Sequence, residues 1–233
     1  MGMHDGHRER LRAQFLAGGL DPMPDVKVLE LLLFYTIPRR DVNPLAHELL
    51  ERFGSLAGVM EAPVEELARV PGISEATATH LHLIPQAARR YLRDVSGRVR
   101  VLNNTKRVGE YLLPYFFAER DEVVYLLCLD AKCKPLCVRL ISRGSVNSAT
   151  VEPRKVVQAA LSANATSVVL AHNHPSGVAL PSQEDRDVTA LVYRALSAVD
   201  ILLVDHLIIA GADYVSLASD GVIGKLMEGR NGL

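Results

Sequence analysis

The residues best suited to chemistry are two histidines one position apart, within Ala171-His172-Asn173-His174-Pro175. They follow Thr166-Ser167-Val168-Val169-Leu170, a β-branched and apolar run that is typical of a buried strand. Side chains two positions apart on an extended chain point to the same face, so both imidazoles can reach one point. The spacing therefore predicts a metal site at the end of a strand.

A carboxylate that could complete this site stands at the start of a predicted helix, Ser182 to Val199. Asp185 lies in the first turn of that helix, where the helix dipole favours a negative charge, and it could turn back toward the histidines. Two imidazoles and one carboxylate leave the fourth position of tetrahedral zinc open, as in catalytic zinc sites. The sequence thus predicts Zn²⁺ bound by His172, His174 and Asp185. The alternative is two ordinary loop histidines and a helix-start charge.

These residues resemble a known motif. His172, Asn173 and His174, then seven residues, Ser182, two residues and Asp185 are similar to the zinc motif of the JAB/MPN (JAMM) metalloproteases. The wording His-Asn-His-Pro-Ser-Gly resembles the bacterial RadC branch of that superfamily, of the UPF0758 type. The resemblance implies a zinc-dependent hydrolase, a metallopeptidase or isopeptidase that cleaves an amide bond.

The resemblance also implies a glutamate ahead of an apolar strand. Glu122 precedes such a run, Val123 to Asp130, and is the residue predicted to match this glutamate; Glu152 is the competing candidate because it lies nearer to the histidines in sequence. A carboxylate is needed to take a proton from the attacking water and pass it to the leaving group. The Ser182 hydroxyl could hold that water or the developing oxyanion, or it could cap the helix, and both roles are compatible.

Composition limits the classes of protein to consider. The chain has 233 residues, 48% of them hydrophobic, which is enough for the packed cores of one or two domains. A net charge of -1 gives no overall attraction to polyanions. The sequence shows neither a membrane-length apolar run nor a secretory leader, which predicts a cytosolic protein without membrane contact. We assign no function to the three cysteines, Cys128, Cys133 and Cys137.

The first hundred residues have helical patterning throughout. Arg8, Arg10 and Arg12 predict an exposed basic helix face near the start. Further on, Val70-Pro71-Gly72-Ile73-Ser74 resembles the turn of a helix-hairpin-helix, which would imply DNA binding through a phosphate. Ser74 replaces the second glycine of that motif and Glu75 adds a negative charge, so a packing or protein-contact role is an equal alternative.

The polar segment Ser96-Gly97-Arg98 marks a predicted domain boundary. Before it, residues 1–97 predict an all-α helix-hairpin-helix domain. After it, residues 98–233 alternate helices and strands, which predicts a three-layer α/β/α domain with a mixed sheet. The resemblance implies the JAB/MPN, cytidine deaminase-like form of that domain, so the whole chain is an α+β protein of two domains.

Three functions remain open on these residues. The first is the zinc hydrolase, acting on a peptide or protein substrate. The second is a DNA-repair or DNA-binding accessory protein that combines the helix-hairpin-helix with a nuclease or scaffold. The third is a JAB/MPN fold used as an interaction platform. The role of His206, beside Asp205 in a predicted strand, is also open between support of a metal ligand and an ordinary core position. Oligomeric state is not predicted.

Overall fold

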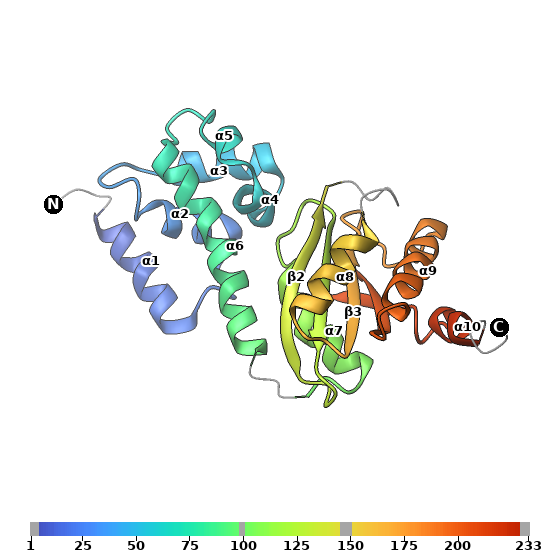
Figure 1. The fold of residues 1–233 in the computed structure, drawn as a ribbon. Coiled ribbons are helices and arrows are strands. Elements are labelled where there is room, and N and C mark those ends of the chain that lie inside the picture. The colour runs from blue at the N-terminus through green and yellow to red at the C-terminus, as the bar shows by residue number, and fades with distance from the viewer. Residues whose placement is uncertain (1–4, 98–100, 145–150, 229–233) are drawn as a thin grey trace. The chain divides into compact units, whose positions relative to one another are not determined.

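The chain divides into two compact units, Met1–Ala88 and Arg89–Leu233 (Figure 1). A computed structural model describes residues 5–97, 101–144 and 151–228. The predicted boundary at Ser96-Gly97-Arg98 reaches into residues 98–100, which lie outside the described residues. Each unit has its own buried hydrophobic residues.

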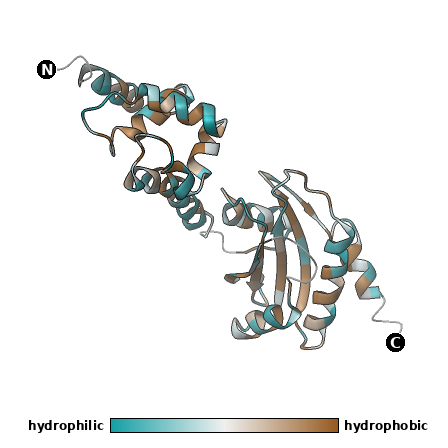
Figure 2. Cartoon of the chain, turned by 90° about the horizontal axis from the view of Figure 1, so that it is seen from above, coloured by the Kyte–Doolittle hydropathy of each residue, from teal (hydrophilic) through white to brown (hydrophobic). Residues whose placement is uncertain are grey.

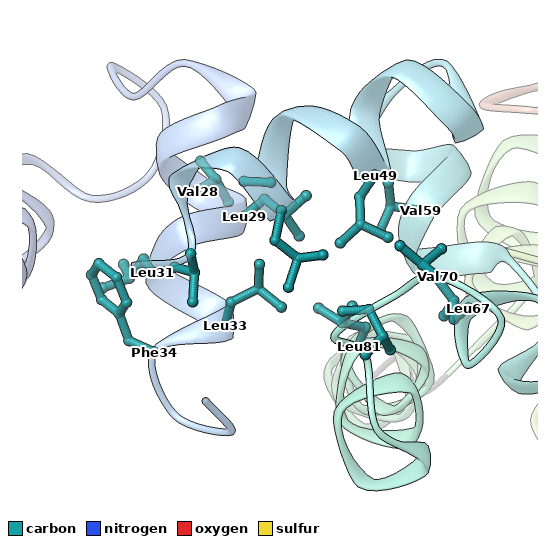
Figure 3. Packing of buried hydrophobic residues seen from close by; sticks show 14 of the residues in the cluster. Val28, Leu29, Leu31, Leu33, Phe34, Leu49, Val59, Leu67, Val70 and Leu81 are labelled. Atoms are coloured by element: carbon teal, nitrogen blue, oxygen red, sulfur yellow. The ribbon is translucent and has the colours of Figure 1, made fainter. Parts of the chain in front are cut away.

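The first unit is helical, as its sequence predicts. Its elements are α1 (Asp5–Gly18), α2 (Asp25–Leu33), α3 (Asn43–Phe53), α4 (Leu56–Glu61), α5 (Val64–Leu67) and the first part of α6 (Glu75–Ser96). Leucines from four of these helices are almost fully buried in one core: Leu29, Leu33, Leu49, Leu67 and Leu81. Figure 3 shows these side chains gathered between the helices, where their burial stabilises the helical unit.

The prediction of an exposed basic face on α1 is wrong for Arg8, one of its three arginines. Arg8 is buried, and its guanidinium donates hydrogen bonds to the backbone carbonyls of Ile37 at 2.8 Å and Arg40 at 2.6 Å. It also lies over the ring of Phe34, 4.5 Å from the centroid. Arg8 therefore satisfies carbonyl groups after α2 instead of lying on the exposed face of α1.

A tight turn joins α5 to α6 at the predicted hairpin. Gly72 has a φ of +94°, which glycine adopts without strain, and Ile73 is buried behind it. The Ser74 hydroxyl accepts a hydrogen bond from the Thr77 amide at 3.1 Å, so one amide at the start of α6 already has a partner. Assignment of this turn to the helix-hairpin-helix class, and DNA binding through it, stay predictions.

The second unit is built on a five-stranded mixed sheet of order β2-β1-β3-β4-β5. β3 and β4 are parallel, and the other neighbouring strands are antiparallel. The elements are α7 (Thr105–Phe116), β1 (Val123–Leu129), β2 (Pro135–Arg143), α8 (Pro153–Ser162), β3 (Ser167–Asn173), α9 (Gln183–Ser197), β4 (Leu202–Ala210), β5 (Asp213–Ser216) and α10 (Val222–Glu228).

Both faces of this sheet are covered, which explains why β1 and β3 are buried along their whole length. Alternate residues of β1 serve two cores: Leu126 packs toward α8 and α9, whereas Leu127 packs toward α7. The strands are mostly brown in Figure 2, as expected of a sheet buried on both sides. The predicted mixed sheet with helices on both faces is confirmed. No helix of the described residues has both the length and the apolar character needed to cross a membrane.

Candidate metal centre

The candidate metal residues meet where β3 ends. His172 is the second-to-last residue of β3, Asn173 ends the strand, and His174 follows it. β1 runs antiparallel to β3, with Val124 opposite His172. The residue that precedes β1 therefore lies beside the histidines. The predicted strand thus carries both imidazoles to its end, as the spacing required.

Three donor groups converge at this point. The Nε2 atoms of His172 and His174 are 3.0 Å apart, and those atoms lie 3.0 and 3.6 Å from the Oδ1 and Oδ2 atoms of Asp185. Ligands on a tetrahedral zinc with bonds of about 2.0–2.1 Å are about 3.3 Å from one another. The donor spacing and the N₂O donor set therefore fit a zinc-sized divalent cation.

The orientation of His174 is suited to the same task. Its Nδ1 atom lies 3.0 Å from the backbone carbonyl of Val178. A carbonyl oxygen can only accept, so Nδ1 must carry the proton, and the neutral ring then presents a lone pair at Nε2. That lone pair points to the donor triangle, which is what a metal ligand requires.

The helix start holds Asp185 in place. Ser182 caps α9: its hydroxyl accepts from the Asp185 amide at 3.0 Å and donates to Oδ2 at 2.6 Å, and the Ser182 amide donates to Oδ2 at 2.7 Å. Burial raises the pKa of Asp185, but the close contact with His172 and the hydrogen bonds from Ser182 outweigh it and hold that pKa well below its usual value. Asp185 is therefore ionised, and the capping alternative for Ser182 is observed; a further role for its hydroxyl in catalysis stays a prediction.

Glu122, and not Glu152, is the glutamate that lies with the histidines. A carboxylate oxygen of Glu122 and one nitrogen each of His172 and His174 lie within 4.8 Å of one another. Glu152 instead precedes α8 and forms an ion pair with Lys155 at 2.8 Å, with both side chains about half exposed. The geometry supports the choice of Glu122 over Glu152, while its role as the base stays a prediction.

Asn173, between the two histidines, fixes the segment that carries Glu122. Its side-chain oxygen accepts from the Val123 amide at 2.8 Å, and its side-chain nitrogen donates to the Asp121 carbonyl at 3.0 Å. The side chain is buried, and its hydrogen bond with the Val123 amide is shielded from water, whereas the one to the Asp121 carbonyl is partly buried. One amide side chain thus holds the backbone on either side of Glu122 against the end of β3.

Replacing Asn173 with alanine is expected to lower the free energy of unfolding by about 2 kcal/mol, because the buried N–H of Val123 loses its partner and the hydrogen bond to the Asp121 carbonyl is lost. Urea unfolding of the metal-free protein measures this change. Asn103 is exposed, so Asn103→Ala is the matched control and should change stability by less than about 0.5 kcal/mol. Equal stability of the two variants would contradict the bridging role of Asn173.

Sequence reasoning left two neighbours of this site unassigned. His206 is buried, and its Nε2 atom lies 2.9 Å from Nδ1 of His172. Burial lowers the pKa of His206 well below its usual value, so the ring is neutral. Thr189, which the sequence did not single out, contacts the other nitrogen of His206 at 2.6 Å. The only signal for Thr189 was its position one helical turn after Asp185.

Asp205, the other residue considered beside His206, makes a different set of contacts. Its carboxylate accepts hydrogen bonds from the Ser216 hydroxyl at 2.7 Å and from the amides of His206 and Ala218 at 2.7 and 3.0 Å. These contacts tie β4 to β5 and to the segment that follows β5. Asp205 is thus a satisfied buried carboxylate that joins two strands.

Fold and site together define an α/β protein with a candidate divalent-metal centre at a strand end. The family model described as "RadC-like JAB domain" matches residues 102–222. Similar proteins include UPF0758 proteins of Ruegeria pomeroyi, 39% identical over 93% of this chain and 97% of the relative, and of Rhodobacter capsulatus, 37% identical over 91% and 100%. A UPF0758 protein of Nitrosococcus oceani is 36% identical over 92% and 96%. The chain belongs to the RadC family, and the predicted family is confirmed.

Proposed function

We propose that this protein is a zinc-dependent hydrolase that cleaves an amide bond of a peptide or protein, with His172, His174 and Asp185 as the zinc ligands. The observation that carries the proposal is the convergence of their three donor groups at spacings near those of tetrahedral zinc. Membership of a family with a JAB domain supports metal-dependent hydrolysis as the class of reaction.

Each residue has a separate part in this reaction. Zinc, when bound, polarises a substrate carbonyl and lowers the pKa of water beside it from about 16 to about 7. Glu122, next to the imidazoles, accepts the proton of the attacking water and returns it to the leaving nitrogen, so that the amide bond breaks to an acid and an amine. Ser182 keeps Asp185 oriented through the cap of α9.

The DNA-accessory alternative has less support from the described residues. The net charge is -1, and Ser74 already satisfies an amide at the start of α6. DNA binding would show as a mobility shift that weakens steeply as salt rises, because phosphate contacts release counterions. Such a shift would favour the accessory role.

Two measurements on the unaltered protein test the proposed function. We expect elemental analysis to find about one zinc per chain, in keeping with a single donor triangle. We also expect cleavage of quenched fluorescent peptides or of lysine ε-amide conjugates that stops when a chelator removes zinc and returns when zinc is restored. A protein that fails to take up zinc, or cleavage that ignores the chelator, would contradict the proposal.

A further inference from the structure

We infer that Thr189 and His206 are positioning residues that hold His172 in the single tautomer able to bind a metal. This inference deepens the proposed function and rests on it in taking zinc as the ion. The evidence is a continuous line of hydrogen bonds from α9, through β4, to β3. Each step of that line admits one direction of donation.

The line begins at Thr189, whose hydroxyl has one proton to donate. Its Oγ1 atom lies 2.6 Å from the backbone carbonyl of Asp185, and a carbonyl can only accept, so the hydroxyl proton is used there. Oγ1 also lies 2.6 Å from Nδ1 of His206. In that second contact Oγ1 must accept, and therefore Nδ1 of His206 carries the ring proton.

The second step fixes the direction of the hydrogen bond between His206 and His172. A neutral imidazole has one N–H, so with its proton on Nδ1, His206 has a lone pair at Nε2. Nδ1 of His172 lies 2.9 Å from that lone pair and must donate to it. The Nε2 atom of His172, which faces His174 and Asp185, is thereby the nitrogen left to bind a cation.

Burial shields these three side chains from water. His172, Thr189 and His206 are exposed by 2%, 0% and 1%. Water therefore cannot readily substitute for a lost partner, and the opposite tautomer of His206 would set two N–H groups or two lone pairs against each other. The bond from Thr189 to the Asp185 carbonyl is common in helices, but it does not explain the contact with His206. The network thus links His172 and Asp185, two of the three proposed metal ligands.

The expected result is a graded loss of zinc affinity, measured by competition with a chelating dye. Thr189→Val keeps the side-chain shape but removes the hydroxyl, and it should weaken zinc binding by about tenfold, the lower end of the range for losing a direct partner of a metal ligand, because Thr189 acts through His206. Thr189→Ser restores the hydroxyl and should stay within about threefold of the parent. Thr77→Val, at a buried threonine of α6, controls for burial of a methyl group and should bind zinc as the parent does.

A second readout needs no zinc. In the metal-free full-length protein, imidazole ¹⁵N shifts should place the His206 proton on Nδ1. A proton on Nε2 of His206 would overturn the inference, as would parental zinc affinity in Thr189→Val or equal weakening by valine and serine. These outcomes are separate from failure of the proposed function. A parent that binds zinc but cleaves nothing still permits the affinity comparison, and a parent that binds no zinc still permits the tautomer measurement.

Discussion

Replacing His174 with alanine is expected to abolish stoichiometric zinc binding, with a loss of affinity greater than about 100-fold. Loss of an outer partner of a metal ligand already costs about 10–100-fold, and removal of one of three ligands must cost more. His174 is the better of the two histidines to change, because its side chain is 17% exposed, whereas that of His172 is 3% exposed and tied to His206. The metal content after dialysis against limited free zinc measures the effect.

The control for this variant is another histidine. His47 is exposed on α3, so His47→Ala should retain about one zinc per chain. Metal-free His174→Ala should unfold near the same urea concentration as the metal-free parent, because its ring lies at the edge of the core. Retention of zinc by a folded His174→Ala protein would show that the donor triangle is not the binding site.

The part of the site that sequence could predict lies within short segments. His172 lies in β3 and His174 follows that strand directly, so a spacing of two residues brings both imidazoles to one point, and Asp185 follows from the start of α9. Period and capping signals act over a few residues, so they predict α9 and the end of β3 well. The resemblance to a family supplied Glu122, which residue spacing alone did not assign.

The contact of His206 with His172 depends instead on strand register. A shift in the pairing of β3 with β4 places Val168 opposite Leu203 but Val169 opposite Asp205. Without this extra residue in β4, side-chain alternation would turn Asp205 toward the face of His172 and His206 toward the opposite core. Sequence cannot fix such a shift, since both residues are compatible with a buried strand. The roles of Asp205 and His206 were therefore open until the pairing was known.

Asn173 and Arg8 show the same limit for single side chains. Asn173 in the motif could have been a loop residue, and only the approach of the segment before β1 gives it two partners. Arg8 lies in an arginine-rich segment that predicts an exposed helix face, yet its side chain is buried and hydrogen-bonded to carbonyls after α2. In both cases the partners are distant in sequence, so local pattern carries no information about them.

Replacing Glu122 with glutamine should reduce hydrolysis by about 10²–10⁴-fold, because an amide of similar shape cannot accept the proton of the attacking water. Zinc affinity should stay within a few-fold of the parent value, since His172, His174 and Asp185 remain. Cleavage under saturating substrate and zinc titration with a competing dye measure the two effects on one preparation. The control is Glu152→Gln, which removes the other candidate glutamate and should leave both quantities unchanged.

The pair of measurements separates the two tasks that a carboxylate at this position could perform. Glu122 lies close enough to His172 and His174 to be a metal ligand as well as a base. A base loses rate and keeps zinc when it becomes glutamine, whereas a ligand loses both, because a neutral amide oxygen is a much weaker donor to zinc than a carboxylate. Full activity of Glu122→Gln together with loss of activity in Glu152→Gln would transfer the role of the base to Glu152.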